Sequence, residues 1–153
     1  MGRVMAVDLG SKRIGVACSD VTRTLASPHA VIERRGSLGA DHKALRREAD
    51  ELEVELVIVG LPLSLDGRDG PAAKSVRTEV NALRVAFEPI PVELFDERFT
   101  TVTAHQSMME RNMKGPARRR VVDKVAAAVM LQSYLDSDPR HDSRARRAAL
   151  HQD

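Results

Sequence analysis

The segment Val4-Met5-Ala6-Val7-Asp8-Leu9-Gly10-Ser11 decides the fold, because it is an apolar run that ends in an acid and a tight turn. Short apolar runs of this kind are typical of strands that are buried on both faces of a sheet. A second apolar segment, residues 13–19, follows directly after the turn. This close spacing predicts an antiparallel hairpin of two strands, 4–8 and 13–19.

Beyond the hairpin, strand-like and helix-like patterns alternate along the chain. Runs of apolar residues predict a third strand around 29–32 after the Ser27-Pro28 pair, a strand over 54–59 ended by Gly60, and a strand over 90–95. Helical spacing and capping residues predict helices over about 38–52, 71–87, 103–113 and 121–135. The order predicts an α/β fold with a mixed five-stranded sheet, in which the first three strands are antiparallel and the later ones parallel. Helices are expected on both faces.

Length and composition indicate one domain. The chain has 153 residues, of which 42% are hydrophobic, enough for a single aliphatic core. Residues 138–153 contain four arginines and little apolar content, so we expect a basic, disordered tail there. The predicted domain therefore covers residues 1–137.

The overall charge and the single cysteine restrict the function classes. With 24 Lys and Arg against 22 Asp and Glu, the net charge of +2 permits a nucleic-acid partner. Cys18 alone excludes an internal disulfide and Cys-rich zinc patterns, and its apolar surroundings predict a buried thiol rather than a bridge between chains. No signal peptide or membrane-spanning run is evident, so we expect a cytoplasmic protein without a membrane partner.

Acidic residues stand at places where core packing alone would not put them. Asp8 ends the first strand, Asp96 and Glu97 end the last strand, and Asp123 lies near the start of a helix that is apolar on all sides. Buried carboxylates repel one another unless a cation joins them, and oxygen ligands favour Mg²⁺ or Mn²⁺. The alternatives are structural: Asp8 could brace the glycine turn, one of Asp96 and Glu97 could be structural, and Asp123 could cap its helix or pair with Arg119.

Basic and hydroxyl residues near these acids are candidates for contacts with phosphates. For the cluster Arg118, Arg119 and Arg120, the alternative is a charged face that only contacts solvent. Aromatic residues are too scarce for a base-stacking platform, so recognition through the backbone and shape of the nucleic acid is expected. The candidate nucleic-acid-binding residues are Lys12, Arg13, Arg98, Thr100, Thr101, Lys114, Arg118, Arg119 and Arg120.

Four motifs together resemble the YqgF family, described as RuvX-like Holliday junction resolvase homologues and as nucleases of pre-16S ribosomal RNA. They are residues 2–17, the Val59-Gly60-Leu61-Pro62-Leu63 segment with Asp66-Gly67 and Gly70-Pro71, the Asp96-Glu97-Arg98-Phe99-Thr100-Thr101 segment, and Asp123-Lys124-Val125-Ala126-Ala127 with residues 131–135. The resemblance covers nearly the whole chain except the tail. Ser11 and Phe99 depart from the Thr and Leu expected in the family, at positions without a catalytic role.

The resemblance implies a ribonuclease-H-like fold and catalytic, metal-holding acids at Asp8, Glu97 and Asp123, which selects Glu97 over Asp96. It also implies Mg²⁺ or Mn²⁺ as cofactor and hydrolysis of phosphodiester bonds, with 5′-end processing of pre-16S ribosomal RNA as the expected role. Holliday junction resolution is the alternative. The partner would then be a structured RNA precursor or branched DNA, bound by a monomer or a homodimer.

Two further alternatives belong to other classes. One is a non-catalytic nucleic-acid-binding or scaffold protein that keeps the fold. The other is an ATPase of the actin and hexokinase type, because Asp8-Leu9-Gly10-Ser11 between two strands looks like the phosphate loop of those proteins. Such ATPases generally need two domains around a nucleotide cleft, and the length of this chain indicates one.

Overall fold

The computed structural model describes residues 2–100 and 118–137, and for residues 118–123 it describes the backbone alone. The helix predicted over 103–113 and the predicted tail, 138–153, lie outside the described residues. The described elements are, in chain order, β1 (Arg3–Leu9), β2 (Arg13–Ser19), β3 (Ala26–Glu33), α1 (Leu38–Glu51), β4 (Val54–Leu61), α2 (Pro71–Phe87), β5 (Val92–Asp96), the short 3₁₀ helix η1 (Glu97–Phe99) and α4 (Arg118–Ser137).

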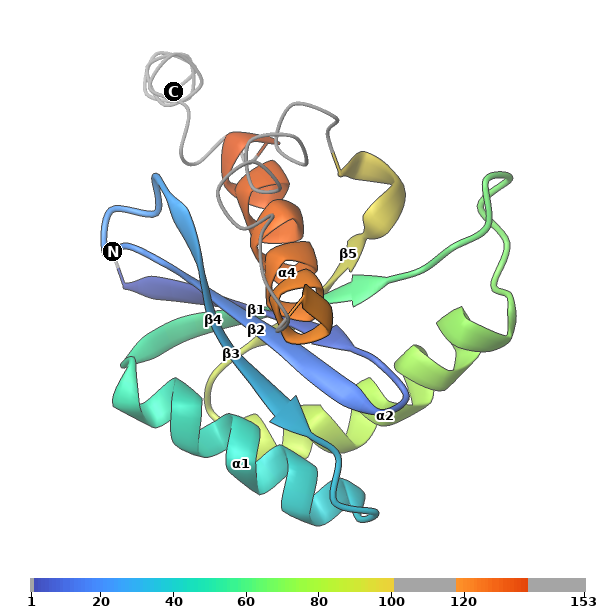
Figure 1. Cartoon of the computed structure of the whole chain (residues 1–153), viewed down its shortest axis with the longest axis horizontal. Helices are drawn as coiled ribbons and strands as arrows, with labels where there is room; N and C mark the ends of the chain where they lie inside the picture. Colours follow the sequence, from blue (N-terminus) through green and yellow to red (C-terminus); the bar gives the residue numbers. More distant parts are fainter. Residues whose placement is uncertain (1, 101–117, 138–153) are drawn as a thin grey trace, which may run out of the picture.

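The five strands form one mixed sheet in the order β3-β2-β1-β4-β5 (Figure 1). The first three strands are antiparallel neighbours, whereas β4 runs parallel to both β1 and β5. The predicted α/β fold with a mixed five-stranded sheet is therefore confirmed. The topology puts β1, the strand that carries Asp8, in the centre of the sheet.

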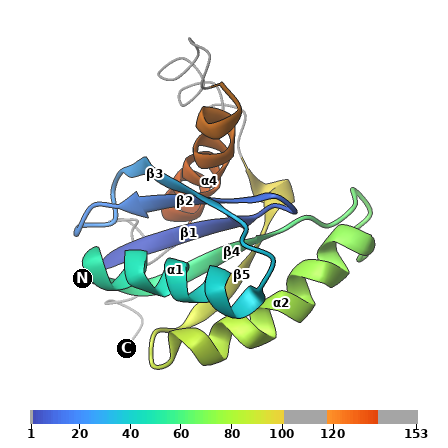
Figure 2. The same ribbon diagram turned by 60° about the horizontal axis from the view of Figure 1, so that its bottom comes forward.

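Helices cover the two faces of the sheet unequally, with α4 on one face and α1 and α2 on the other (Figure 2). The alternation of side chains along β1 divides the core accordingly. Val4 and Ala6 pack in the same apolar cluster as the α4 residues, whereas Met5 and Val7 pack with residues of α1 and α2. Each face of β1 is thus buried, as its continuous apolar sequence predicts.

The third strand is longer than predicted. β3 begins at Ala26 and runs through Pro28, which was expected to precede it. Proline is tolerated at a sheet edge or at a bulge. Both conditions hold here, because β3 is an edge strand and its register with β2 shifts next to Pro28.

The ends of β4 and β5 also differ from the prediction. β4 continues through Gly60 to Leu61, so the prediction that Gly60 ends the strand is wrong. The glycine marks a close approach of other groups to the strand, which is described below. β5 begins at Val92, two residues later than predicted, because Ile90 belongs to the turn after α2 and donates its backbone N–H to Phe87 O.

Local signals fix the helices well. Ser37 caps α1 by accepting a hydrogen bond from the backbone N–H of Ala40, and Pro71 occupies the first turn of α2, where a missing N–H costs nothing. The predicted helix over 121–135 is confirmed as part of α4. Across the described part of the chain, none of the helices combines the length and apolar character needed to cross a membrane.

Cys18 lies in the core on β2 and is 7% exposed, as its apolar surroundings predict. Burial raises the pKa of its thiol above the ordinary value, which disfavours the reactive thiolate. The alternative of an exposed Cys18 that links two chains is therefore wrong.

Phe87, the last residue of α2, tests the packing of the α1 and α2 face. Its side chain is fully buried, so Phe87→Ala should lower the free energy of unfolding by about 3–5 kcal/mol. Urea unfolding followed by circular dichroism measures this loss. Val85→Ala, on an exposed position of the same helix, is the control and should change the free energy by less than about 0.5 kcal/mol. Equal losses in the two variants would contradict the assigned core.

Candidate active site

Asp8 is placed by the alternation along β1. It follows Val4 and Ala6 at the strand period, so its side chain lies on the face of the sheet that α4 covers. The residue is partly exposed at the end of the strand and pairs with Gly15 across the hairpin. The structure thus brings a carboxylate to the carboxyl end of the central strand, on the face of the sheet that α4 covers.

Glu97 comes to the same face from the end of β5. In the parallel part of the sheet, Val7 lies beside Val59 and Gly60 lies beside Phe95, so the ends of β1, β4 and β5 meet at one edge. Glu97 begins η1 directly beyond that edge and is half-buried. Parallel strands therefore deliver Asp8 and Glu97 to one place, as expected for the carboxyl ends of strands in an α/β sheet.

Gly60 allows Glu97 to lie against β4. A Cβ atom at Gly60 would stand 2.5 Å from Oε1 of Glu97 and 2.7 Å from Sδ of Met130 on α4. Both separations are too short for a side chain unless the ends of Glu97 and Met130 move. Glycine thus lets Glu97 and α4 pack closely against the strand, whereas the sequence pattern indicated only a strand end.

Asp96 has a different task from Glu97. Its side chain accepts a hydrogen bond from the backbone N–H of Arg98, which caps η1, and it forms an ion pair with the Arg98 guanidinium at 2.6 Å. These hydrogen bonds hold the pKa of Asp96 below its ordinary value. Asp96 is therefore engaged in a local ion pair, whereas the choice of Glu97 as the catalytic acid stays a prediction.

The surroundings of Glu97 change its affinity for a proton. Burial, followed by the negative charges of Asp8 and Asp96, raises the pKa of Glu97 to about 7. Repulsion between neighbouring carboxylates has this effect, and a nearby cation reverses it. Near neutral pH, Glu97 can therefore either hold or release a proton.

Several predicted site residues are described only in part or lie outside the described structure. The backbones of Arg118, Arg119, Arg120 and Asp123 lie in α4, but their side chains are not described. Thr101 and Lys114 lie wholly outside the described residues. Among the described side chains, no group of three acidic, histidine or cysteine residues is arranged to hold a metal ion. The described acidic pair is Asp8 and Glu97.

Of the described basic and hydroxyl candidates, several are engaged within the protein. Lys12 is exposed in the β1–β2 turn, whereas Arg13 forms an ion pair with Glu33 at 3.3 Å. The Arg98 guanidinium binds Asp96 and also donates to the backbone carbonyl of Leu65. Thr100 is partly exposed and donates its backbone N–H to Glu97 O at the end of η1.

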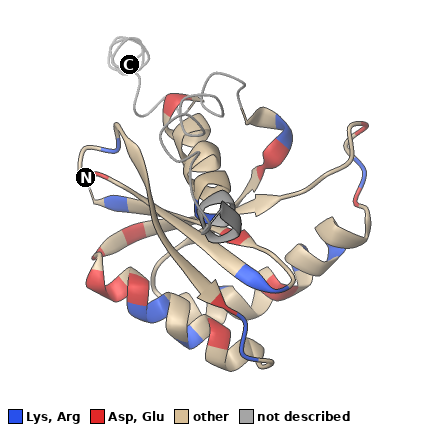
Figure 3. Ribbon diagram, in the orientation of Figure 1, with Lys and Arg blue, Asp and Glu red and all other residues tan. Residues whose placement is uncertain are grey.

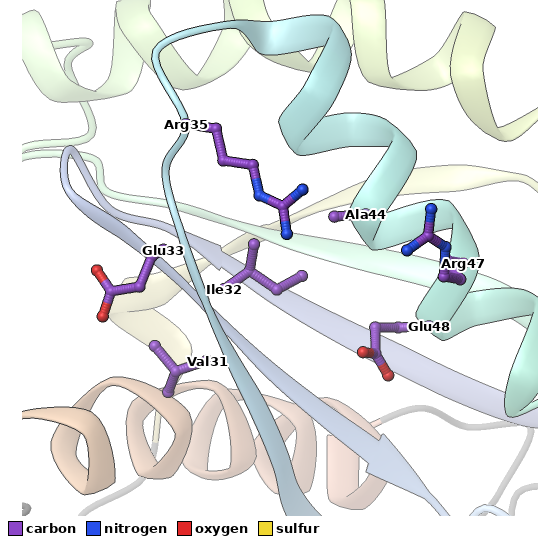
Figure 4. Close-up of a pocket in the computed structure, with 7 residues that line it drawn as sticks. All are labelled: Val31, Ile32, Glu33, Arg35, Ala44, Arg47 and Glu48. Carbon is purple, nitrogen blue, oxygen red and sulfur yellow. The ribbon is translucent and has the colours of Figure 1, made fainter.

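Charged residues and a pocket lie elsewhere in the described part of the chain. Acidic and basic residues are interspersed along α1 (Figure 3). A pocket of about 300 Å³ between β3 and α1 contains none of the predicted site residues (Figure 4). Its lining carries both charges and comprises Val31, Ile32, Glu33, Arg35, Ala44, Arg47 and Glu48.

Comparison with solved structures places the fold. The chain is similar to RuvC of Thermus thermophilus, solved in complex with a Holliday junction substrate, with a TM-score of 0.58 at 18% identity. The match covers 89% of this chain and 96% of that one. A second structure of Thermus thermophilus RuvC matches with a TM-score of 0.59 at 16% identity, over 88% of this chain and 95% of that one. At these identities the likeness establishes the fold.

Comparison of sequences establishes the family. A relative from Streptomyces coelicolor is 44% identical over 137 residues, covering 90% of this chain and 81% of the relative. One from Mycobacterium sp. (strain KMS) is 40% identical over 149 residues, covering 97% and 83%. Both carry the name "Putative pre-16S rRNA nuclease". Residues 2–137 match the model of the family RuvX, described as Holliday junction resolvase, and the chain therefore belongs to the RuvX family.

Proposed function

We propose that this chain is a nuclease that hydrolyses phosphodiester bonds with Mg²⁺ or Mn²⁺ held by Asp8, Glu97 and Asp123. The observation that carries the proposal is the placement of Asp8 and Glu97 on one face of the sheet, close enough for the charge of one to raise the pKa of the other. Membership of the RuvX family supports the reaction class. The family also accounts for the Asp8-Leu9-Gly10-Ser11 turn, so we do not propose the ATPase alternative.

The donor set fits a hard divalent cation. Carboxylate oxygens are the ligands that Mg²⁺ and Mn²⁺ prefer, and a cation beside Asp8 and Glu97 would relieve their repulsion. Such an ion would supply positive charge to the phosphodiester and activate the attacking water. Asp8, on the central strand, would hold the ion from the sheet, and Glu97 would hold it from η1 once it has lost its proton.

The direction of α4 supports Asp123 as the third acid. Gln132 accepts from the backbone N–H of Ala26 and donates to Thr24 O, at the end of the sheet opposite Asp8. The helix therefore runs from the acidic end of the sheet toward the β2–β3 turn. Asp123 precedes Met130 by seven residues, or about two helical turns, and Met130 lies beside Gly60 and Glu97.

The names of the relatives indicate two substrates. Pre-16S ribosomal RNA, trimmed at its 5′ end, is the substrate that we propose, because relatives at 40–44% identity carry that name. A Holliday junction is the second candidate, favoured by the description of the family model. In both cases Lys12, exposed in the turn after Asp8, would contact a phosphate.

Asp8→Asn tests the catalytic assignment. The cleavage rate should fall at least about 100-fold while substrate binding is kept, because the variant loses the charge that holds the cation but not the phosphate contacts. The assay uses Mg²⁺, Mn²⁺ or EDTA with an RNA spanning the 5′ end of the 16S precursor, a synthetic four-way DNA junction and linear duplex DNA.

Asp50→Asn, which alters an exposed carboxylate on α1, is the matched control for that assay and should cleave like the wild type. Cleavage of the RNA alone would identify a maturation nuclease, and symmetric nicking of the junction alone a resolvase. Retained turnover in Asp8→Asn would overturn the role of Asp8, and no cleavage by the wild type would favour the scaffold alternative.

The charge of Glu97 can be followed directly in the metal-free protein. A ¹³C NMR titration of its carboxyl should give a midpoint at about pH 7. Asp8→Asn should lower the midpoint, since removing the neighbouring negative charge favours the ionised form, yet burial should keep it above the ordinary value. Mg²⁺ added to the wild-type protein should also lower the midpoint, because the cation displaces the proton. A midpoint that neither change moves would contradict the proposed site.

Gly60→Ala tests the placement of Glu97 without removing its carboxyl. The new methyl group meets the flexible ends of Glu97 and Met130, so the fold should survive with a loss of about 1–3 kcal/mol. The displaced carboxyl should lower kcat at least about tenfold. Gly39→Ala, where the nearest atom lies at 3.7 Å, is the control and should keep wild-type kcat. Wild-type kcat in Gly60→Ala would show that the contact does not position Glu97.

A further inference from the structure

A buried charged cluster lies on the other face of the sheet, between the end of β3 and helices α1 and α2. We call it the Arg34 network, and it consists of Arg34, Asp41, His42 and Glu79. Asp41 is 1% exposed, His42 3% and Glu79 8%. Charged groups are rarely buried to this extent unless each of them is paired.

Arg34 is the centre of the network. Its two terminal nitrogens bind the two carboxylate oxygens of Glu79 at 2.8 and 2.9 Å, and Nη1 also binds Asp41 at 3.3 Å. The second oxygen of Asp41 accepts from the backbone N–H of Arg35, and the His42 ring bonds Glu79 at 2.8 Å. One guanidinium therefore joins β3 to α1 and α2.

Hydrogen bonding keeps the Glu79 carboxylate ionised. Burial alone would raise the pKa of Glu79, but hydrogen bonds from Arg34 and His42 outweigh it and hold that pKa below its ordinary value. An intact buried ion pair often adds little stability compared with well-packed apolar residues.

The remaining contacts of Arg34 lead to the turn that follows Asp8. Its Nε donates to Gly10 O at 2.9 Å, and its backbone N–H donates to Lys12 O at 3.0 Å. The backbone N–H of Gly10 in turn donates to Asp8 O at 3.1 Å. Arg34 thus fixes two carbonyl groups of the β1–β2 turn, and that turn begins two residues after Asp8.

The turn itself has little freedom to move. A Cβ atom at Gly10 would stand 2.5 Å from the backbone oxygen of Arg13, so the chain passes close to itself at this point. A small shift of the Gly10 carbonyl would therefore move both ends of the turn. One of those ends carries Asp8.

We propose that Arg34 is a positioning residue for Asp8: the buried carboxylates of Glu79 and Asp41 hold its guanidinium, and Nε of that guanidinium holds the Asp8 turn. The inference rests on the proposed function for its effect on cleavage. The arrangement requires arginine, because only a guanidinium can bind a carboxylate through two nitrogens while a third nitrogen donates elsewhere. Lysine keeps the charge but loses the fork.

Arg34→Lys is the central variant, and Arg46→Lys is its matched control. Arg46 also donates to a carboxylate, Asp50 at 2.9 Å, and to a carbonyl, Glu88 O at 3.0 Å, and it joins α1 to the end of α2. None of its described contacts reaches the Asp8 turn. The control therefore removes an equivalent link between the two helices without touching the turn.

Cleavage kinetics of the RNA or junction that the wild type cuts give the first readout. Arg34→Lys should lower kcat at least about tenfold and change KM less than about twofold, because it displaces a catalytic carboxylate and leaves the phosphate contacts in place. Glu79→Gln should lower kcat in the same direction and serves as the second variant if Arg34→Lys does not fold. Arg46→Lys should keep wild-type kcat.

Amide NMR of the metal-free proteins gives a readout that does not depend on catalysis. The Gly10 and Gly15 amide signals should shift in Arg34→Lys and Glu79→Gln and stay in place in Arg46→Lys. If the wild type cleaves nothing but these signals shift, the proposed function fails and the positioning role stands. Unshifted amides, or equal kcat in Arg34→Lys and Arg46→Lys, would overturn the inference.

Discussion

Repulsion between two carboxylates on one face of a sheet is the constraint around which this end of the molecule is built. Asp8 comes from the central strand, and Glu97 lies against β4 at a glycine, so the fold brings the two carboxylates to the same end of the sheet. Asp96 adds a further negative charge beside Glu97, which its ion pair with Arg98 partly neutralises. Burial, together with the charges of Asp8 and Asp96, raises the pKa of Glu97 to about 7, and a divalent cation would relieve the repulsion.

The sequence predicted the elements well wherever a regular pattern ran over several turns or residues. β2 and α2 have the predicted bounds, because each has a clear period and a turn or cap at its start. Besides the late start of β5 at Val92, the errors fall at Pro28 and Gly60, where a residue that usually breaks a strand lies within one. Tertiary context overrides the local preference there, through an edge position at Pro28 and through close packing at Gly60.

The candidate site was only partly accessible from sequence. Strand ends indicated Asp8 and the Asp96-Glu97 pair, but the choice within that pair came from the resemblance. The sequence did not indicate the ion pair that engages Asp96 with Arg98. Nothing local indicated the contacts of Arg34, because Glu79 lies 45 residues away in the chain. The glycine at position 60 predicts a strand end, but its cause is the close approach of Glu97 and Met130 to the strand.

The ion pairs at the acidic end bear on how a nucleic acid would be attracted. Arg13 and Arg98 each bind a carboxylate of the protein, so a phosphate that reaches them competes with Glu33 or Asp96. Surface pairs of this kind contribute about 0–1 kcal/mol, so such an exchange costs little. Arginines that are already paired could therefore bind a phosphate when nucleic acid arrives, and without nucleic acid their charge is balanced by the paired carboxylates.

Pro28 has a consequence for assembly. An edge strand presents unpaired backbone groups to which a strand of another molecule can add. β3 lacks one backbone donor at Pro28 and changes register at the same place, so its outer edge offers no regular ladder for a second copy to extend. Pro28, which interrupts the sequence pattern of this strand, therefore also disfavours edge-to-edge aggregation at β3.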